Sequence, residues 1–249
     1  MWNKGLSYRE RHGLGQVGMN KDTNSNVGDA LNADTNKSHA VNTDENAPKH
    51  SLGLVFFPAF DWKISETHPE RQERLLYTRD QIVEEGLLDI PNIKEYNPIV
   101  ADWDTIERVH VGAPDLESWV TEAHRVSAGG AIEAADAVMR GEVDRAFALV
   151  RPPGHHAMAM VHGIRGFCTI NIEAVMIQHM RQTYGIKRVA VVDTDVHHGD
   201  GSQDVFYHDP DTLYISFHQD GRTLYPGTGF MDEFGGPQAI GGNIDIPLP

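Results

Sequence analysis

Two pairs of adjacent histidines are the residues in this sequence best suited to chemistry. His155 and His156 form the first pair, and His197 and His198 form the second. Each pair lies in a glycine-containing turn directly after a segment that is predicted as a β-strand, so we expect both pairs at the ligand-binding edge of a sheet. Imidazole changes its charge near neutral pH and is also a common metal ligand. Proton transfer, metal binding or both are therefore the expected chemistry.

Carboxylates precede the second histidine pair at a spacing that suits metal ligands. Asp193, Asp195 and His197 occupy every second position, and in an extended backbone such side chains project to the same side. Two carboxylates and an imidazole in one place are poorly solvated unless a cation lies between them. Oxygen and imidazole ligands suit zinc, manganese or iron, and a catalytic zinc typically has three protein ligands and a water. Asp195 and His197 would supply two ligands; the alternative is that Asp and His only cap a turn here.

The first histidine pair strengthens the metal interpretation. It lies in the sequence RPPGHHA at 151–157, where two prolines and a glycine restrict the turn. Lone histidine pairs are usually incidental, but this pair is expected at the same edge as the carboxylates. One of its two imidazoles could then take a proton from a metal-bound water.

Predicted strands and helices alternate along the chain, which indicates a parallel sheet covered by helices. The apolar segments predicted as strands are 52–58, 146–150, 188–195, 212–218 and a last one within 243–249. The segments predicted as helices are 68–86, 118–142 and 170–185. The second of these helices is expected to break or kink near Gly129 and Gly130, because glycine destabilises a helix interior. In parallel sheets, ligands bind at the carboxyl ends of the strands, where both histidine pairs fall.

The composition narrows the possible functions. The 249 residues contain 21 Lys plus Arg and 36 Asp plus Glu, a formal charge of −15 that disfavours a nucleic-acid partner. No apolar run reaches the roughly 18 residues of a membrane span. A single cysteine, Cys168, cannot form an intramolecular disulfide. The opening MWNKGLSYRERHGLGQ contains no apolar signal-peptide core, so the default location is the cytoplasm.

The composition changes near residue 50. Residues 1–50 contain eight Asn but only six Val, Leu, Ile or Phe, too little apolar surface to offset the entropy lost on ordering. We therefore expect 1–50 to be a disordered or irregular N-terminal extension, with an irregular but packed arm as the alternative. Residues 51–249 are expected to form the folded part.

Several motifs together identify a family resemblance. In chain order they are HPER at 68–71, RPPGHHA at 151–157, GFC at 166–168, DTDVHHGDG at 193–201, SFH at 216–218 and YPGTG at 225–229. From about Leu52 onward the sequence resembles the zinc-dependent histone deacetylase superfamily. Pro152 and Pro153 before the histidines are similar to the class II enzymes and their bacterial relatives, including acetylpolyamine amidohydrolases. The resemblance implies an arginase-like three-layer α/β/α fold with a mostly parallel sheet, and makes 51–249 the N-terminal portion of a deacetylase-like catalytic domain.

The resemblance implies zinc-dependent hydrolysis of N-acetyl amides, in acetyl-lysine or in acetylated polyamines, to acetate and free amine. Zinc held by Asp195 and His197 would polarise the amide carbonyl and lower the pKa of a bound water. His156 matches the position of the general base, and His155 matches its electrostatic partner. The acidic surface of the chain would help to attract such cationic substrates.

The resemblance also implies roles in orientation, substrate binding and ion binding. Asp193 would orient His155, and Asp200 would orient His156. The residues implied for the walls of the substrate tunnel are Gly166, Phe167 and Tyr225. Those implied for a structural potassium ion are Asp193, Asp195, His197, Ser216 and Phe217, and those for a second monovalent ion are Phe206, Asp209 and Thr212. Cys168 is expected to pack near the tunnel floor.

Two motifs of the family do not occur in the sequence. They are a GFD-type motif that carries the third zinc ligand and a GGY-type motif that carries a transition-state tyrosine. Asp220, Asp232 and Asp245 lie in no recognisable motif, and we expect none of them to replace the ligand. The fold is therefore expected to be incomplete at its C-terminus, and the 249-residue chain alone is expected to be inactive or nearly so.

Two other functions stay open. A non-catalytic deacetylase-like binding module, or a degenerate paralogue, would explain the two absent motifs, whereas the survival of the earlier site residues argues against it. An arginase-type hydrolase with two metal ions could use the same fold, and RPPGHHA disfavours it. The motifs carry no information on the oligomeric state.

Overall fold

The computed structural model of the chain describes residues 50–57, 65, 67–111 and 116–249. The predicted extension at 1–50 lies outside the described residues except for His50. Among the described residues, no helix combines the length and the apolar character needed to cross a membrane.

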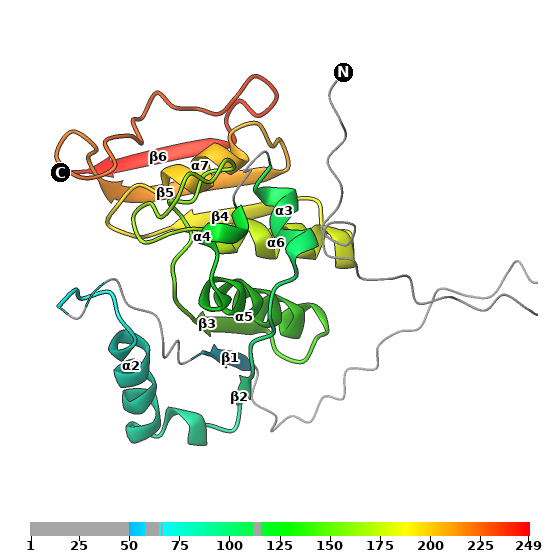
Figure 1. Cartoon of the computed structure of the whole chain (residues 1–249). Coiled ribbons are helices and arrows are strands. Elements are labelled where there is room, and N and C mark those ends of the chain that lie inside the picture. The colour runs from blue at the N-terminus through cyan, green and yellow to red at the C-terminus, as the bar shows by residue number, and fades with distance from the viewer. Residues whose placement is uncertain (1–49, 58–64, 66, 112–115) are drawn as a thin grey trace, which may run out of the picture. The chain divides into compact units, whose positions relative to one another are not determined.

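The strands of the described residues form two parallel sheets of three strands each (Figure 1). In the first sheet, β1 (Leu52–Phe56) lies between β2 (Ile93–Tyr96) and β3 (Arg145–Leu149). In the second, β5 (Thr212–Gln219) lies between β4 (Val189–Asp193) and β6 (Asn243–Leu248). The prediction of parallel strands is confirmed, but these strands form two sheets rather than one. Within the described part of the chain, β3 and β4 each pair with a strand on one side only.

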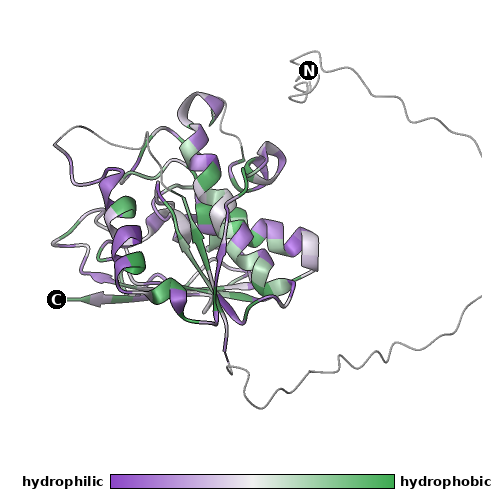
Figure 2. Cartoon of the chain, turned by 90° about the horizontal axis from the view of Figure 1, so that it is seen from below, coloured by the Kyte–Doolittle hydropathy of each residue, from purple (hydrophilic) through white to green (hydrophobic). Residues whose placement is uncertain are grey.

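Helices connect the strands and flank them on both sides (Figure 2). The helices are α2 (Glu73–Glu84), α3 (Trp103–Val109), α4 (Leu116–Trp119), α5 (Glu122–Met139), α6 (Ile172–Tyr184) and α7 (Asp200–Phe206), with a 3₁₀ turn at Leu87–Asp89. α5 packs on β1 and β3, and α6 packs on α5 and α3. Apolar side chains of these helices form the main core, in which Ile106, Ile132 and Val175 are fully or almost fully buried. The α/β class predicted from the alternation is confirmed.

The predicted break in the helix at 118–142 is wrong, because α5 runs without interruption through Gly129 and Gly130. A Cβ atom at Gly129 would overlap the carbonyl oxygen of Ile99, and one at Gly130 would lie 2.6 Å from Val150 Cγ1. The two glycines therefore let distant backbone and the end of β3 approach the helix closely. The gain in packing outweighs the intrinsic cost of glycine in a helix.

Asn171 caps the N-terminus of α6 and connects that helix to the segments that carry the histidines. Its side-chain oxygen accepts a hydrogen bond from Ala174 N at 3.0 Å, as a helix cap does. Its side-chain amide donates to Ser202 Oγ at 3.0 Å and to Ala157 O at 3.3 Å. One buried residue thus fixes α6 against α7 and against the turn that contains the first histidine pair.

Candidate active site

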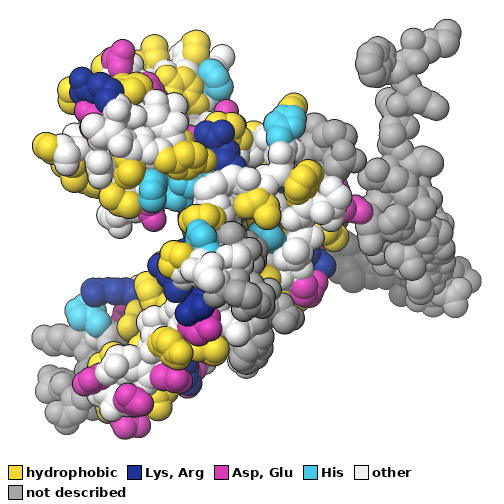
Figure 3. Space-filling view, turned by 60° about the vertical axis from the view of Figure 1, so that its left-hand side comes forward, with side chains coloured by type: hydrophobic (Ala, Val, Ile, Leu, Met, Phe, Trp, Pro, Cys, Tyr) yellow, Lys and Arg dark blue, Asp and Glu magenta, His cyan; other side chains and the backbone are white. Residues whose placement is uncertain are grey.

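Both histidine pairs follow the carboxyl ends of strands, His155 and His156 after β3 and His197 and His198 after β4. A pocket of about 480 Å³ opens between these segments. The predicted site residues that line it are His155, His156, Gly166, Phe167, Asp195, His197 and Tyr225. On the face drawn in Figure 3, histidine side chains gather beside a hollow in the surface. Residues far apart in the sequence therefore line one pocket, as expected from the position of both histidine pairs after strand ends.

The convergence of Asp195 and His197 has a different cause from the one predicted. β4 ends at Asp193, and the backbone bends after it instead of continuing as a strand, so the alternation argument is wrong beyond Asp193. Side-chain oxygens of the aspartates hold the bend. Asp195 N donates to Asp193 Oδ1 at 3.0 Å, and His197 N donates to Asp195 Oδ1 at 2.8 Å.

Asp195 and His197 fit two of the ligands of a zinc ion. His197 Nδ1 lies 3.0 Å from Asp195 Oδ1, and the two side chains, 38% and 48% exposed, line the pocket. Catalytic zinc sites typically use three protein ligands. No group of three or more His, Cys, Asp or Glu side chains in the described ranges is arranged to hold a metal ion. The described residues therefore fit part of a zinc site, and a third protein ligand would have to come from outside them.

The aspartates outside any motif lie away from this pocket. Asp245 Oδ1 lies 3.3 Å from His198 Nε2 in a buried group beside β6, and Asp220 forms an exposed ion pair with Arg222. Neither of them, nor Asp232, lines the pocket. The expectation that none of them replaces the third ligand stays a prediction.

His155 is paired with Asp193, the last residue of β4. His155 Nδ1 lies 2.9 Å from Asp193 Oδ2, and Tyr214 on β5 donates its hydroxyl to the same oxygen at 3.0 Å. Burial acts to lower the pKa of His155, but the hydrogen bond and the charge of Asp193 outweigh it and hold the pKa above its ordinary value. His155 is therefore the histidine of the pair that favours the charged form.

His156 is paired with Asp200, the first residue of α7. His156 Nδ1 lies 2.8 Å from Asp200 Oδ1, and Arg165 donates to Asp200 Oδ2. Burial lowers the pKa of His156, the hydrogen bond with Asp200 raises it, and the neighbouring His155 lowers it again, which leaves it below its ordinary value. His156 thus favours the neutral form that a general base requires.

A tight turn at 165–168 forms one wall of the pocket. Arg165 and Cys168 exchange backbone hydrogen bonds of 2.9 and 2.8 Å, and the central residues Gly166 and Phe167 have φ of +52° and +68°. Positive φ at both central positions is the pattern of a type I′ turn. A Cβ at Gly166 would overlap the imidazole of His156, so only glycine fits there.

Aromatic rings complete the walls of the pocket. The Tyr225 ring centroid lies 5.0 Å from that of His156, and the His156 centroid lies 6.0 Å from that of His197. The Phe167 ring packs edge-on against His68 at 4.8 Å. Cys168 is fully buried behind this wall, and burial raises the pKa of its thiol well above the ordinary value, which agrees with the packing role expected for it.

Sequence reasoning missed an ion-pair network that joins two of the quoted motifs. The buried Glu70 of HPER accepts hydrogen bonds from Arg151 Nε at 2.7 Å and from Arg74 Nη1 at 2.5 Å. Both arginines line the pocket with Glu70. The signal was present, because Glu70 and Arg151 lie inside HPER and RPPGHHA, but neither motif alone shows that they meet. Arg165 and Tyr214 were also missed.

The residues expected at the potassium sites lie on and near β4 and β5. Asp193 and Ser216 are register partners in the sheet, and Ser216 Oγ lies 2.8 Å from His218 Nδ1. At the second site, Asp209 and Thr212 both accept hydrogen bonds from Arg181, at 2.7 and 2.9 Å. Both ion sites stay predictions.

Fold and site together define an α/β protein with a pocket of histidines and aspartates at its strand ends, and comparison with known proteins identifies its family. Residues 114–249 match the family model described as the histone deacetylase domain. The chain belongs to the histone deacetylase family.

Individual relatives agree with the family model. The chain is 39% identical over 216 residues to a probable deacetylase of Archaeoglobus fulgidus, covering 79% of this chain and 59% of that protein. It is 49% identical over 201 residues to a probable deacetylase of Methanothermobacter thermautotrophicus, covering 73% and 58%. The crystal structure of the HDA15 HD domain superposes with a TM-score of 0.70 at 30% identity, covering 79% of this chain and 62% of that one. The chain thus spans less than two thirds of the length of each.

Proposed function

We propose that the chain carries part of a zinc-dependent active site that hydrolyses N-acetyl amides to acetate and free amine. The observation that carries the proposal is the convergence of His156, Asp195 and His197 on one pocket. Membership of a deacetylase family supports the same reaction. The zinc ion, its third ligand, the potassium ions and a cytoplasmic location belong to this proposal.

The two histidines divide the work of the reaction. His156 holds Nδ1 against Asp200, which leaves Nε2 to accept a proton from the water that adds to the acetyl carbonyl carbon. The bond between this carbon and the amide nitrogen then breaks, and the nitrogen takes the proton held by His156 as it leaves as the amine. His155, favouring the charged form beside Asp193, stabilises the negative charge that develops on the acetyl oxygen. A bound zinc supplies polarisation of the carbonyl and acidifies the water.

The pocket suits an acetylated alkyl chain, because the aromatic rings of Phe167 and Tyr225 form its walls. Acetyl-lysine in a peptide and acetylputrescine both present such a chain. Comparing kcat/KM for these two substrates would separate a protein deacetylase from a polyamine amidohydrolase.

The test measures acetate release with added zinc by two proteins. One is the 249-residue chain, for which we expect little or no turnover because the described residues supply two zinc ligands. The other is a chimera in which this chain is joined to the part of the Archaeoglobus relative that lies outside the matched segment. We expect the chimera to release acetate and His156→Ala to abolish the release. Turnover that persists in His156→Ala would contradict the proposal.

A non-catalytic binding module is the second candidate, and the incomplete set of zinc ligands favours it. Such a module would bind the acetylated chain without cleaving it. A chimera that binds zinc and an acetyl-lysine peptide but releases no acetate would support this candidate over hydrolysis.

A further inference from the structure

We propose that His198 and His218 are positioning residues of this site, which hold the segment 228–230 and thereby keep Tyr225 on the wall of the pocket. Neither histidine lines the pocket, although His198 is the direct neighbour of His197, which does. The inference rests on the proposed function only for the task of that wall. The place of Tyr225 is measurable without turnover, so the two can fail separately.

Three of the quoted motifs contain a residue that the proposed reaction does not use, and these residues meet in one buried cluster. They are His198 of DTDVHHGDG, His218 of SFH and Gly229 of YPGTG. The ring centroids of the two histidines lie 4.7 Å apart, and both residues are 1% exposed. A Cβ at Gly229 would overlap His218 Nε2 and His198 Cγ, so only glycine fits there. The YPGTG segment therefore packs directly against both rings.

Each histidine bonds one residue of this segment. His198 Nδ1 lies 2.8 Å from Thr228 Oγ1, within hydrogen-bond distance. His218 Nε2 donates to Gly229 O at 2.9 Å. One bond thus holds a side chain of the segment, and the other holds its backbone.

The second nitrogen of each ring is bonded to the sheet. His198 Nε2 lies 3.3 Å from Asp245 Oδ1 on β6, and His218 Nδ1 lies 2.8 Å from Ser216 Oγ on β5. Each imidazole therefore connects the segment to a strand. Because the rings are buried and bonded at both nitrogens, they are rigid supports.

Glu233 completes the attachment of the segment. Its Oε1 accepts from the backbone N–H groups of Gly229 at 3.2 Å and Phe230 at 3.0 Å. Its Oε2 accepts from the side-chain amide of Gln203 on α7. All three residues of 228–230 are thus bonded to side chains of the cluster.

Tyr225 depends on this attachment because it lies three residues before Thr228. Tyr225 is 46% exposed, and its ring centroid lies 5.0 Å from that of His156 and 6.2 Å from that of His197. A half-exposed ring gains little from burial, so the backbone that carries it must restrict its place. Releasing 228–230 gives this backbone conformational freedom, which favours departure of the ring from the wall.

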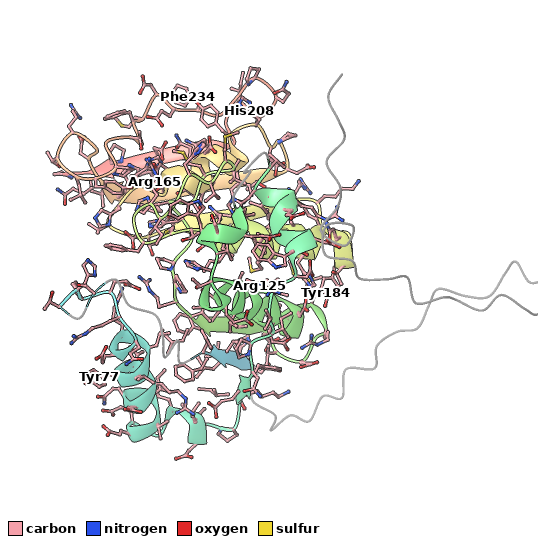
Figure 4. All side chains as sticks on the ribbon, viewed as in Figure 1. Tyr77, Arg125, Arg165, Tyr184, His208 and Phe234 are labelled. Carbon is pink, nitrogen blue, oxygen red and sulfur yellow. The ribbon has the colours of Figure 1, made fainter. Side chains whose placement is uncertain are left out.

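The experiment detects the nuclear Overhauser effect between the ring protons of Tyr225 and His156, in the metal-free full chain with isotope-labelled Tyr and His rings. The signal is assigned by its loss in Tyr225→Phe and in His156→Gln. The contact of His179 with Tyr184 on α6, at a centroid distance of 6.4 Å, is the internal reference for a folded chain (Figure 4).

Paired variants of each histidine separate the hydrogen bond from the space that the ring fills. An asparagine amide reaches about as far as Nδ1 of histidine, and a glutamine amide about as far as Nε2. We therefore expect His198→Asn to keep the signal and His198→Gln to lose it, because only the asparagine can bond Thr228. The order reverses at His218, where glutamine can still donate to Gly229 O and asparagine cannot.

A smaller change at Thr228 gives a third pair. We expect Thr228→Val to lose the signal and Thr228→Ser, which keeps the hydroxyl, to retain it. The matched control is Thr223→Val, which should also retain the signal. The Thr223 hydroxyl belongs to the same loop but bonds Gln219 and Asp220 instead of the cluster.

Three results would overturn the inference. The first is a folded His198→Gln, His218→Asn or Thr228→Val chain in which the signal is as strong as in the parent. The second is loss of the signal in both folded members of a pair, because the place of Tyr225 would then not depend on the hydrogen bond. The third is a folded parent chain without the signal. Three pairs are used so that misfolding of one variant leaves the test intact.

Discussion

Two histidine–aspartate pairs lie side by side in this protein and favour opposite charge states. His155 and His156 are neighbours in the chain with ring centroids 4.1 Å apart, and each presents Nδ1 to an aspartate. The pKa of His155 nevertheless lies above its ordinary value and that of His156 below it. Burial lowers the pKa of both rings, but the hydrogen bond and charge of Asp193 outweigh it for His155, whereas the neighbouring His155 and His197 add to it for His156. The same His–Asp pairing therefore supports opposite charge states, because the groups around the two rings differ.

The largest expected effect is a loss of stability that differs between variants of the two aspartates. We expect Asp193→Ala to lower the free energy of unfolding by about 3–5 kcal/mol, because it removes the charged partner of the buried His155 and the acceptor of the backbone N–H of Asp195. Asp200→Ala should cost less, since the partly exposed Arg165 can turn to water. Urea unfolding at pH 7 measures both, with the exposed Asp232→Ala as the control. Equal losses of stability, or a larger loss for Asp200→Ala, would show that the contacts of Asp193 do not stabilise the fold more than those of Asp200.

The second prediction acts on the His156 side only. Gly166→Ala should destabilise the fold by about 2–4 kcal/mol, because it strains a positive φ and pushes a methyl group into the imidazole of His156. Gly185→Ala is the matched control, since Gly185 has a φ of +66° and nothing within 4 Å of an added Cβ. We expect it to cost about 1 kcal/mol, from the backbone alone. Similar losses in the two variants would show that the contact with His156 contributes nothing.

His110 is a buried histidine that bonds no carboxylate, so its pKa shows what burial does when no aspartate opposes it. His110 bonds Met158 O and Asn171 N, and burial lowers its pKa to about 4. Between pH 6.5 and 4 the unfolded chain binds a proton that the folded chain does not, so stability falls as the pH falls through this window. At pH 5, His110 should have cost the fold about 2 kcal/mol relative to pH 7.

Urea unfolding of the parent chain and of His110→Gln at both pH values tests this prediction. We expect the loss of stability on acidification to be smaller in the variant by that amount, whatever the variant costs at pH 7. An identical loss in both proteins would place the pKa of His110 near its ordinary value.

The smallest effect concerns the neutral donor to Asp193. Tyr214→Phe removes the hydroxyl that bonds Asp193 Oδ2 and Gly199 O, each at 3.0 Å, and should cost about 1–2 kcal/mol of unfolding free energy. Tyr77→Phe is the control, because Tyr77 on α2 is 69% exposed (Figure 4). If the two variants are equally stable, the hydroxyl of Tyr214 does not support the His155 pair.

Much of the fold follows from local sequence patterns. The apolar runs around β3, β4 and β5 were predicted within a few residues, since buried parallel strands are apolar along their length. The short β2 and α3 were not predicted, because they carry too little periodicity. The predicted break at Gly129 was wrong. The glycine is there because the backbone of Ile99, thirty residues away in the chain, packs so closely that a Cβ would not fit, and not because the helix ends.

The candidate site could be predicted as a set of residues but not as a set of charges. Motif order brought His155, His156, Asp195 and His197 to one pocket. The alternation of a strand did not extend past Asp193, because side-chain oxygens hold a bend there. No sequence pattern joined Arg165 to Asp200, 35 positions apart.

Zinc binding by the metal-stripped chain, measured by titration calorimetry, tests the central claim that Asp195 and His197 form part of a metal site beside His156. We predict that the chain binds zinc and that Asp195→Asn and His197→Gln each remove this binding. His208→Gln should leave it unchanged, because His208 is exposed and does not line the pocket (Figure 4). Zinc binding that is the same in the parent, Asp195→Asn and His197→Gln chains would contradict the account, as would a folded parent chain that binds no zinc.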